Sequence, residues 1–301
     1  MDVAFRPAKL EDLEPCGRIV QEAILDLRRC HGVALPQPLG PPTFQRLCLE
    51  DDPSGLWVAE AAGEVVGSTM SWMSDRFWFL SQLFVRPDLQ AKGLGQALLN
   101  GPLQQALRRE ATNRALITFA YNTRATGLYV RNGMYPRVPL CFVAAPAAAL
   151  PGDLGDAGHA AEEIRPTAET LGWLGEIDEA VLGFRRDKHH EYLLHSGTAK
   201  GFRIVRAGRT VGYAYAMPNG RIGPLAVLPG EDQAAVVGAA LRQALRAMRP
   251  EQVTMIVPGP AVRMLGAVSA LGFRIEEPLV LLSAMPFGDW RNYAPCNPGY
   301  M

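Results

Sequence analysis

A loop with two glycines, placed between an apolar strand and a helix, holds the residue types of this 301-residue sequence that best suit chemistry. It runs Leu83-Phe84-Val85-Arg86-Pro87-Asp88-Leu89-Gln90-Ala91-Lys92-Gly93-Leu94-Gly95-Gln96. The free N–H groups and the dipole of the helix start favour phosphate oxygens. A glycine lets a ligand approach the backbone without a Cβ in the way. The loop therefore predicts an anion site.

The spacing of these glycines argues against two common phosphate-binding motifs. A dinucleotide-binding turn needs a third small residue and a carboxylate after the next strand. Here the third position is Leu98, and the next apolar run, 114–119, carries no carboxylate. A P-loop needs Gly-Lys-Ser/Thr after the glycines, and that triplet is missing.

A second polar pattern follows one predicted strand later. It reads Asn122-x-x-Ala125-x-x-Leu128-Tyr129-x-x-x-Gly133 and is followed by an aromatic residue. Asn122 suits the N-cap of a helix, and Gly133 suits the left-handed residue that ends one.

Taken together, Gln90-x-x-Gly93-x-Gly95 and the second pattern resemble the two signatures of the GCN5-related N-acetyltransferases (GNAT), in that order and one strand apart. The resemblance covers about residues 3–142 and implies an α+β fold that binds acetyl-CoA as acyl donor, without a metal. It assigns acetyl-CoA binding to Leu83, Phe84, Val85, Gln90, Ala91, Lys92, Gly93, Leu94, Gly95, Gln96 and Asn122.

The resemblance also implies a mechanism in which an amine attacks the thioester directly. The edge of the strand through Leu83, Phe84 and Val85 would pair with the pantetheine arm and hold the oxyanion. Tyr129 would protonate the departing CoA thiolate, although its place also suits a core residue. Lys92 is either a counter-charge or a solvated lysine, and Asn122 either bonds pantetheine or only caps its helix.

The general base is the least defined part of this prediction. Many family members carry a glutamate on the strand before the loop, whereas Phe77-Trp78-Phe79-Leu80-Ser81-Gln82 has no carboxylate. Ser81 or Gln82 would order a relay water. Asp75 and His31 are bases only if loops bring them close.

Hydrophobic periodicity gives the elements that must position these residues. We expect a strand at 3–6, a helix at about 10–29, a short helix within 31–55, a hairpin from 56–60 and 65–72, and a strand at 78–85. The segment 31–55 either borders the acceptor site or is a surface connection. Pro102 predicts a kink or break in the helix after the loop, because proline lacks the N–H that would bond Leu98.

The pattern then restarts, which predicts a tandem duplication. We expect a catalytic domain at 1–143, a linker at 144–163 and a second domain with a C-terminal tail at 164–301. Both would be mixed, mostly antiparallel sheets flanked by helices. In the second copy Gly93 and Gly95 become Ala235 and Val237, and Asn122 and Tyr129 become Ala261 and Val268. The second copy is therefore predicted to be degenerate.

Composition limits the partners. The net charge is zero, which gives no electrostatic case for nucleic acid or an anionic membrane. Five scattered cysteines without C-x-x-C spacing suit reduced thiols in a cytoplasmic protein. His189 and His190 lack a third ligand at metal spacing, so we expect a solvated helix face or a domain interface there.

The predicted function is an acetyl-CoA-dependent N-acetyltransferase whose acceptor is a small-molecule or peptide amine. The alternative is a non-catalytic acyl-CoA-binding or regulatory protein, which the missing strand glutamate favours and Tyr129 disfavours. The sequence leaves the acceptor and the oligomeric state open, a homodimer included.

Overall fold

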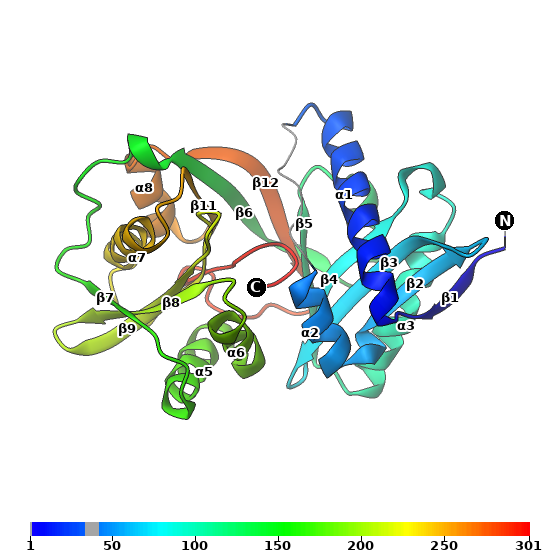
Figure 1. Cartoon of the computed structure of the whole chain (residues 1–301), viewed down its shortest axis with the longest axis horizontal. Helices are drawn as coiled ribbons and strands as arrows, with labels where there is room; N and C mark the ends of the chain where they lie inside the picture. Colours follow the sequence, from blue (N-terminus) through cyan, green and yellow to red (C-terminus); the bar gives the residue numbers. More distant parts are fainter. Residues whose placement is uncertain (1, 34–41) are drawn as a thin grey trace. The chain divides into compact units, whose positions relative to one another are not determined.

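The computed structural model describes residues 2–33 and 42–301, so part of the predicted 31–55 segment lies outside the described residues. By its contacts the chain divides into two units (Figure 1). The first contains residues 1–135 and 282–285, and the second contains 136–281 and 286–301. Both are α+β.

The first unit is a mainly antiparallel sheet with helices on its faces (Figure 1). Its strands, in spatial order, are β1 (Ala4–Pro7), β2 (Leu56–Ala61), β3 (Glu64–Ser74), β4 (Phe77–Val85) and β5 (Asn113–Phe119). Only β4 and β5 run parallel. The helices are α1 (Leu13–Cys30), α2 (Thr43–Asp51), α3 (Leu94–Arg108) and α4 (Thr123–Arg131).

Helix α3 is continuous through Pro102, so of the two predicted outcomes, a kink or a break, the break is wrong. The missing donor removes a single helical hydrogen bond, and packing on the sheet holds the rest of the helix. Leu94 and Leu98 share a buried cluster with Val66 of β3 and Val85 of β4. This cluster fixes the first turn of α3 beside the end of β4.

The second unit repeats this order of elements. Its strands are β6 (Tyr135–Pro146), β7 (Ala160–Glu163), β8 (Lys200–Arg206), β9 (Arg209–Ala216), β10 (Ile222–Val227), β11 (Gln252–Pro258), β12 (Arg274–Ser283) and β13 (Tyr293–Ala294). Its helices are α5 (Ala168–Leu182), α6 (Asp187–His195), α7 (Gln233–Met248) and α8 (Val262–Ala270). The strands are ordered β13-β10-β9-β8-β7 in one sheet, and β12, β6 and β11 are neighbours in the other.

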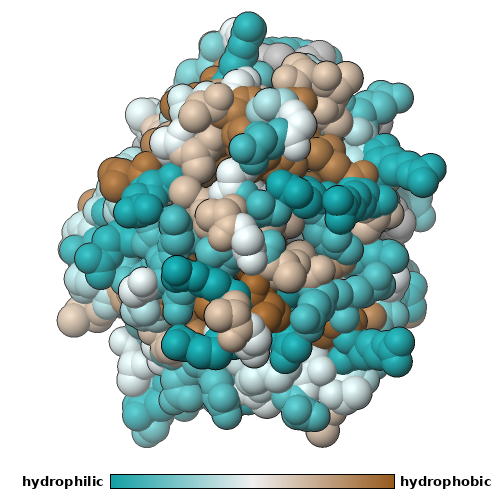
Figure 2. All heavy atoms as spheres, turned by 90° about the vertical axis from the view of Figure 1, so that its left-hand side faces the viewer, coloured by the Kyte–Doolittle hydropathy of each residue, from teal (hydrophilic) through white to brown (hydrophobic). Residues whose placement is uncertain are grey.

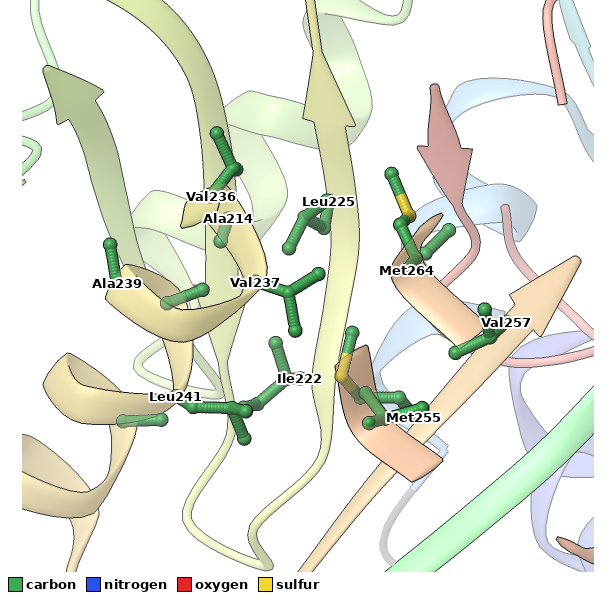
Figure 3. Close-up of a cluster of buried hydrophobic side chains, with 14 of the residues drawn as sticks. Ala214, Ile222, Leu225, Val236, Val237, Ala239, Leu241, Met255, Val257 and Met264 are labelled. Carbon is green, nitrogen blue, oxygen red and sulfur yellow. The ribbon is translucent and has the colours of Figure 1, made fainter. Parts of the chain in front are cut away.

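Apolar side chains of α7, α8 and the strands form the core of the second unit. Figure 3 shows Val237 of α7 pointing towards Ile222 and Leu225 of β10, with Met264 of α8 on the other side of that strand. The duplication expected from the sequence therefore has its own core.

The division by contacts differs from the sequence-based bounds of 1–143, 144–163 and 164–301. Strand β6, from Pro136 on, groups with the second unit, where its residues 140–146 pair with β11. The predicted linker also packs there: Leu154 is buried, and a Cβ on Gly238 of α7 would lie 2.3 Å from the Leu154 carbonyl oxygen. A stretch without periodicity can still be part of a core.

No helix among the described residues is long and apolar enough to cross a membrane. In the view of Figure 2, polar side chains cover most of the surface, and apolar ones gather in small separate groups. Among the cysteines, Cys16, Cys48 and Cys296 are buried, whereas Cys30 is exposed.

Candidate active site

The parallel strands β4 and β5 separate part of the way along their length. They pair from Phe77 with Asn113 to Leu80 with Leu116. The next residue, Ser81, is the extra residue of a bulge against β3, where the register shifts. Ser81 therefore lies where β4 starts to leave β5, and its side chain is buried.

Past this bulge, alternate residues of β4 direct their main-chain groups away from β3. The Arg86 N–H donates to Val66 O at 2.9 Å, and Ser68 pairs with Phe84 in the same register. Hydrogen-bonded and non-bonded pairs alternate in an antiparallel ladder, so the N–H and C=O groups of Leu83 and Val85 face outward. The side-chain amide of Gln90 donates to Val85 O at 3.1 Å. The Leu83 N–H is thus directed to the side on which β5 has separated.

The loop after β4 delivers the start of α3 to the same place. Gly93 is the N-cap, with φ +84°, a value that glycine adopts without strain. Among the described residues no side chain caps this helix. The first helical bond runs from Ala97 N–H to Gly93 O, which leaves the N–H groups of Leu94, Gly95 and Gln96 pointing out of the helix start.

Side chains of the loop and of α4 brace this helix start. Arg124 donates to Gln90 Oε1 at 3.2 Å, and Gln96 bonds Asn132 through both amide groups. Lys92 donates to Asp88 O at 3.2 Å and is exposed. A Cβ on Gly95 would meet only Leu128, at 3.6 Å. The backbone at Gly95 is therefore accessible, and Gln90 acts as a brace between β4 and α4.

Arg124 is a cation that the sequence analysis missed. It is exposed, lies in the first turn of α4 and reaches Gln90 across the loop. The signal was its place two residues after the cap Asn122, on the turn that meets the glycine loop. Together with Lys92 it puts two positive charges beside the uncapped helix.

Helix α4 carries the two polar residues of the second pattern. Asn122 is its N-cap, and its Oδ1 accepts from Ala125 N–H at 3.1 Å. Gly133 follows the helix with φ +77°. Tyr129 is buried, and this burial raises the pKa of its hydroxyl above the usual value. The hydroxyl is therefore protonated at neutral pH.

The structure separates the two bases suggested by the sequence. Asp75 lies in the turn between β3 and β4, eight residues before Leu83, and the strand rises roughly 3.3 Å per residue between them. His31 follows α1, and its ring lies against that of Tyr121, just beyond β5, in a tilted arrangement with 4.8 Å between centroids. His31 therefore lies near the separating ends of the strands, and Asp75 lies at the opposite end.

The prediction of a solvated face at His189 and His190 is wrong. Both side chains are buried in the second unit. His190 Nε2 lies 2.9 Å from Asp178 Oδ2, and its Nδ1 lies 2.8 Å from the Tyr215 hydroxyl. No group of three or more metal-binding side chains occurs among the described residues.

Comparisons with known proteins show which family the chain resembles. Residues 21–134 match the model of the acetyltransferase (GNAT) family. The uncharacterized N-acetyltransferase YhfO of Bacillus subtilis (strain 168) is 32% identical over 100 residues, which are 31% of this chain and 67% of that protein.

Solved structures resemble the chain over nearly its full length. A putative acetyltransferase from Pyrococcus horikoshii has a TM-score of 0.76 at 16% identity, with 99% of this chain and 96% of that one covered. A tandem GNAT protein from the clavulanic acid biosynthesis pathway has a TM-score of 0.64 at 16% identity, with 95% and 99% covered. At these identities the likeness shows the fold alone.

The family implies an acyl-CoA donor, and the uncapped helix, accessible glycine backbone and free strand edge fit such a molecule. On the family match and the relative, this chain is a member of the GNAT family of N-acetyltransferases.

Proposed function

We propose that the first unit binds acetyl-CoA and transfers its acetyl group to an amine. The observation that carries this proposal is the uncapped start of α3 beside the outward-facing edge of β4, within the segment that matches the family. One feature suits a pyrophosphate and the other suits the amides of a pantetheine arm.

The pyrophosphate would lie on the N–H groups of Leu94, Gly95 and Gln96. The helix dipole adds positive potential there, and Lys92 and Arg124 supply formal charge. Both cations are exposed, so their contribution is expected to weaken with salt. Gln90 would act indirectly, since it holds the loop to β4 and α4.

The thioester oxygen would face the Leu83 N–H. This group is directed away from β3 past the bulge at Ser81. A fixed N–H that meets an oxyanion stabilises the tetrahedral intermediate more than the planar substrate. Leu83 is therefore the proposed oxyanion donor.

Tyr129 is the proposed acid. The amine nitrogen attacks the carbonyl carbon, the C–S bond breaks, and the sulfur takes its proton from the Tyr129 hydroxyl. Burial raises the pKa of this hydroxyl, and the same apolar surroundings would raise the basicity of the thiolate. The attacking amine loses its proton through a water at Ser81 or to His31, not to Asp75.

Calorimetric titration with acetyl-CoA tests the cofactor site. Gly93→Glu places a side chain and a negative charge at the start of α3 and should abolish binding. Gly230→Glu is the matched control, because Gly230 lies in the corresponding loop of the second unit, has φ +89° and would also have no described atom within 4 Å of its Cβ. Binding that survives Gly93→Glu, or is lost in both variants, would contradict the assignment.

A second candidate function is acyl-CoA binding without turnover. The absence of a carboxylate from β4 favours it, since many relatives use one as base. Acetyl transfer to any amine in a substrate screen would exclude this second candidate function.

A further inference from the structure

Residues 286–301 belong to the second unit. Most of the apolar side chains from residue 290 onward are buried, with exposed fractions of 6% or less at Trp290, Tyr293, Ala294, Cys296, Tyr300 and Met301. This part of the segment is therefore packed into the second unit.

The segment adds a strand to β10 at a defined edge. The Leu228 N–H donates to Val211 O at 2.8 Å, as Arg86 does to Val66 in the first unit. The main-chain groups of Leu225 and Val227 then face away from β9. Leu225 pairs with Ala294 of β13, and the Val227 N–H donates to Asn292 O at 2.9 Å. Leu225 and Val227 correspond to Leu83 and Val85 at the offset of 142 residues.

The added strand lies where the two strands of the second unit separate. Arg221, just before β10, forms a parallel bridge with Thr254 of β11, and β13 then contacts both strands. In the first unit, β4 and β5 separate in the same way after Leu80. Residues 292–294 thus pair with the edge of β10 in the second unit, and the corresponding edge of β4 in the first unit has no paired strand past Leu80 among the described residues.

Buried polar contacts hold the segment beyond this strand. The Arg221 guanidinium donates to Cys296 O at 3.3 Å, and a Cβ on Gly223 would lie 2.8 Å from Pro295 O. Arg186, paired with Asp178 at 2.9 Å, lies over the Tyr293 ring and also donates to Met301 O. Both members of that ion pair are buried, so the segment completes the surroundings of a charge cluster.

The helix start beside this edge is closed as well. Asp232 is the N-cap of α7, and its carboxylate accepts from Ala234 N–H at 3.1 Å. Ala235 and Val237, which replace Gly93 and Gly95, are both buried, and Figure 3 shows Val237 within the core. Helix α7 therefore begins at a carboxylate cap, three residues before the position that corresponds to Gly93, whereas α3 begins at Gly93 without a side-chain cap among the described residues.

We propose that residues 286–301 are a built-in ligand of the second unit, in which β13 takes on β10 the place that a pantetheine arm takes on β4. This rests on the proposed function of the first unit for the identity of that arm. The consequence is that the chain binds one acyl-CoA, and that the second unit is closed to CoA by its own polypeptide.

Residue-resolved hydrogen exchange on the unmodified chain, with and without saturating acetyl-CoA, tests the proposal. Without ligand, the amides of Leu225 and Val227 should exchange at least about 100-fold more slowly than that of Leu83, because only they are covered. Acetyl-CoA should slow the hydrogen exchange of the Leu83 amide and leave that of the Leu225 and Val227 amides unchanged. It should bind at one equivalent per chain.

A second equivalent of acetyl-CoA, or a ligand-induced change at Val227, would overturn the proposal and make the segment a displaceable cover. If the proposed function of the first unit is wrong, the result is different. Acetyl-CoA would then leave the exchange rate of the Leu83 amide unchanged, whereas the Val227 amide would still exchange slowly. The two inferences can therefore fail separately.

A variant tests whether the segment provides this protection. Ala294→Pro removes a main-chain donor from β13 and should speed exchange at Leu225 and Val227 by about tenfold or more. Ala294→Ser keeps the donor and is the matched control. A folded Ala294→Pro protein with unchanged exchange at both residues would overturn the proposal. If that variant does not fold, the exchange of the unmodified chain decides alone.

Discussion

Helices α3 and α7 follow corresponding strands, β4 and β10, and their first turns differ in the groups that they offer to an anion. Helix α3 begins at a glycine, with no side-chain cap among the described residues. Helix α7 begins at Asp232, whose carboxylate caps it, and continues into buried Ala235 and Val237. The order of strands and helices is the same in both units although the glycines and the uncapped helix start are present in the first unit alone. These elements therefore depend on the buried core of each unit and not on the groups proposed to bind the ligand.

The adjoining strand edges differ in the same sense. The edge of β4 past Ser81 faces the side from which β5 has departed, whereas the edge of β10 is paired with β13. An exposed strand edge presents unpaired N–H and C=O groups that can pair with another chain or with a ligand. In the first unit this edge of β4 is not paired with another described strand past Leu80, whereas in the second unit the edge of β10 is paired with β13.

The largest expected effect is on turnover, in the unit that kept its tyrosine. Tyr129→Phe removes the proposed acid and should lower kcat by about 10² to 10⁴-fold while acetyl-CoA affinity changes little. Steady-state kinetics and calorimetry measure the two quantities. An unchanged kcat would show that Tyr129 is only a core residue, as Val268 is at the equivalent position.

The buried charge cluster of the second unit should give the largest effect on stability. Asp178→Ala leaves Arg186 charged and unpaired in the core, which should cost about 3–5 kcal/mol in the free energy of unfolding. Denaturant unfolding measures it. A loss below about 1 kcal/mol would mean that the pair contributes no more than one on the surface.

Asp178 should also make stability depend on pH. The Arg186 guanidinium and His190 hold the pKa of the Asp178 carboxyl well below its usual value, against the opposing effect of burial. A carboxyl with a lowered folded-state pKa contributes its full stability above the unfolded pKa of about 4 and loses it as the pH falls further. The free energy of unfolding, measured from pH 6 to pH 2, should therefore decrease more steeply below pH 4 in the unmodified chain than in the Asp178→Ala variant.

A smaller effect should follow from giving the first unit the cap of the second. Gly93→Asp places a carboxylate at the start of α3, and Gly93→Asn is its neutral control, since both residues tolerate a left-handed backbone. The aspartate variant should bind acetyl-CoA about tenfold more weakly than the asparagine variant does. Added salt should reduce this difference in affinity, because it screens the charge. Equal losses in the two variants would show that the backbone, not the charge, decides.

The smallest effect concerns the cap of the second unit itself. Asp232→Ala should cost about 1 kcal/mol of stability, through loss of the bond to Ala234 N–H, and should leave acetyl-CoA binding unchanged. Thermal unfolding and titration measure these. New binding in this variant would show that the carboxylate alone keeps CoA from the second unit.

Local signals predicted much of this fold correctly. The cap at Asn122, the left-handed Gly133, the hairpin of β2 and β3, and the repeated order of elements all depend on neighbouring residues. At Pro102 the sequence left a kink and a break as alternatives, and the break is absent from α3 because packing along the whole helix outweighs one lost hydrogen bond.

Long-range pairings could not be read from the sequence. His189 and His190 lie among Arg185, Arg186, Asp187 and Lys188, a run that is typical of a solvated helix. The buried His190 bonds Asp178 of another helix and the strand residue Tyr215, and the buried His189 ring stacks on Tyr300, more than a hundred residues further along the chain. The pairing of β13 with β10 likewise joins segments more than sixty residues apart. Such contacts leave no periodic trace.

Residues 282–285 give the first unit an unusual dependence on the order of synthesis. They belong to that unit, where the Ala284 N–H donates to Arg114 O and Asn113 bonds both main-chain groups of Met285. A ribosome makes residues 1–135 before the partner of β5 at these positions, which lies more than 140 residues further along the chain. The first unit is therefore completed only after most of the second has been made, and a gene cut between the two copies would deprive it of four residues.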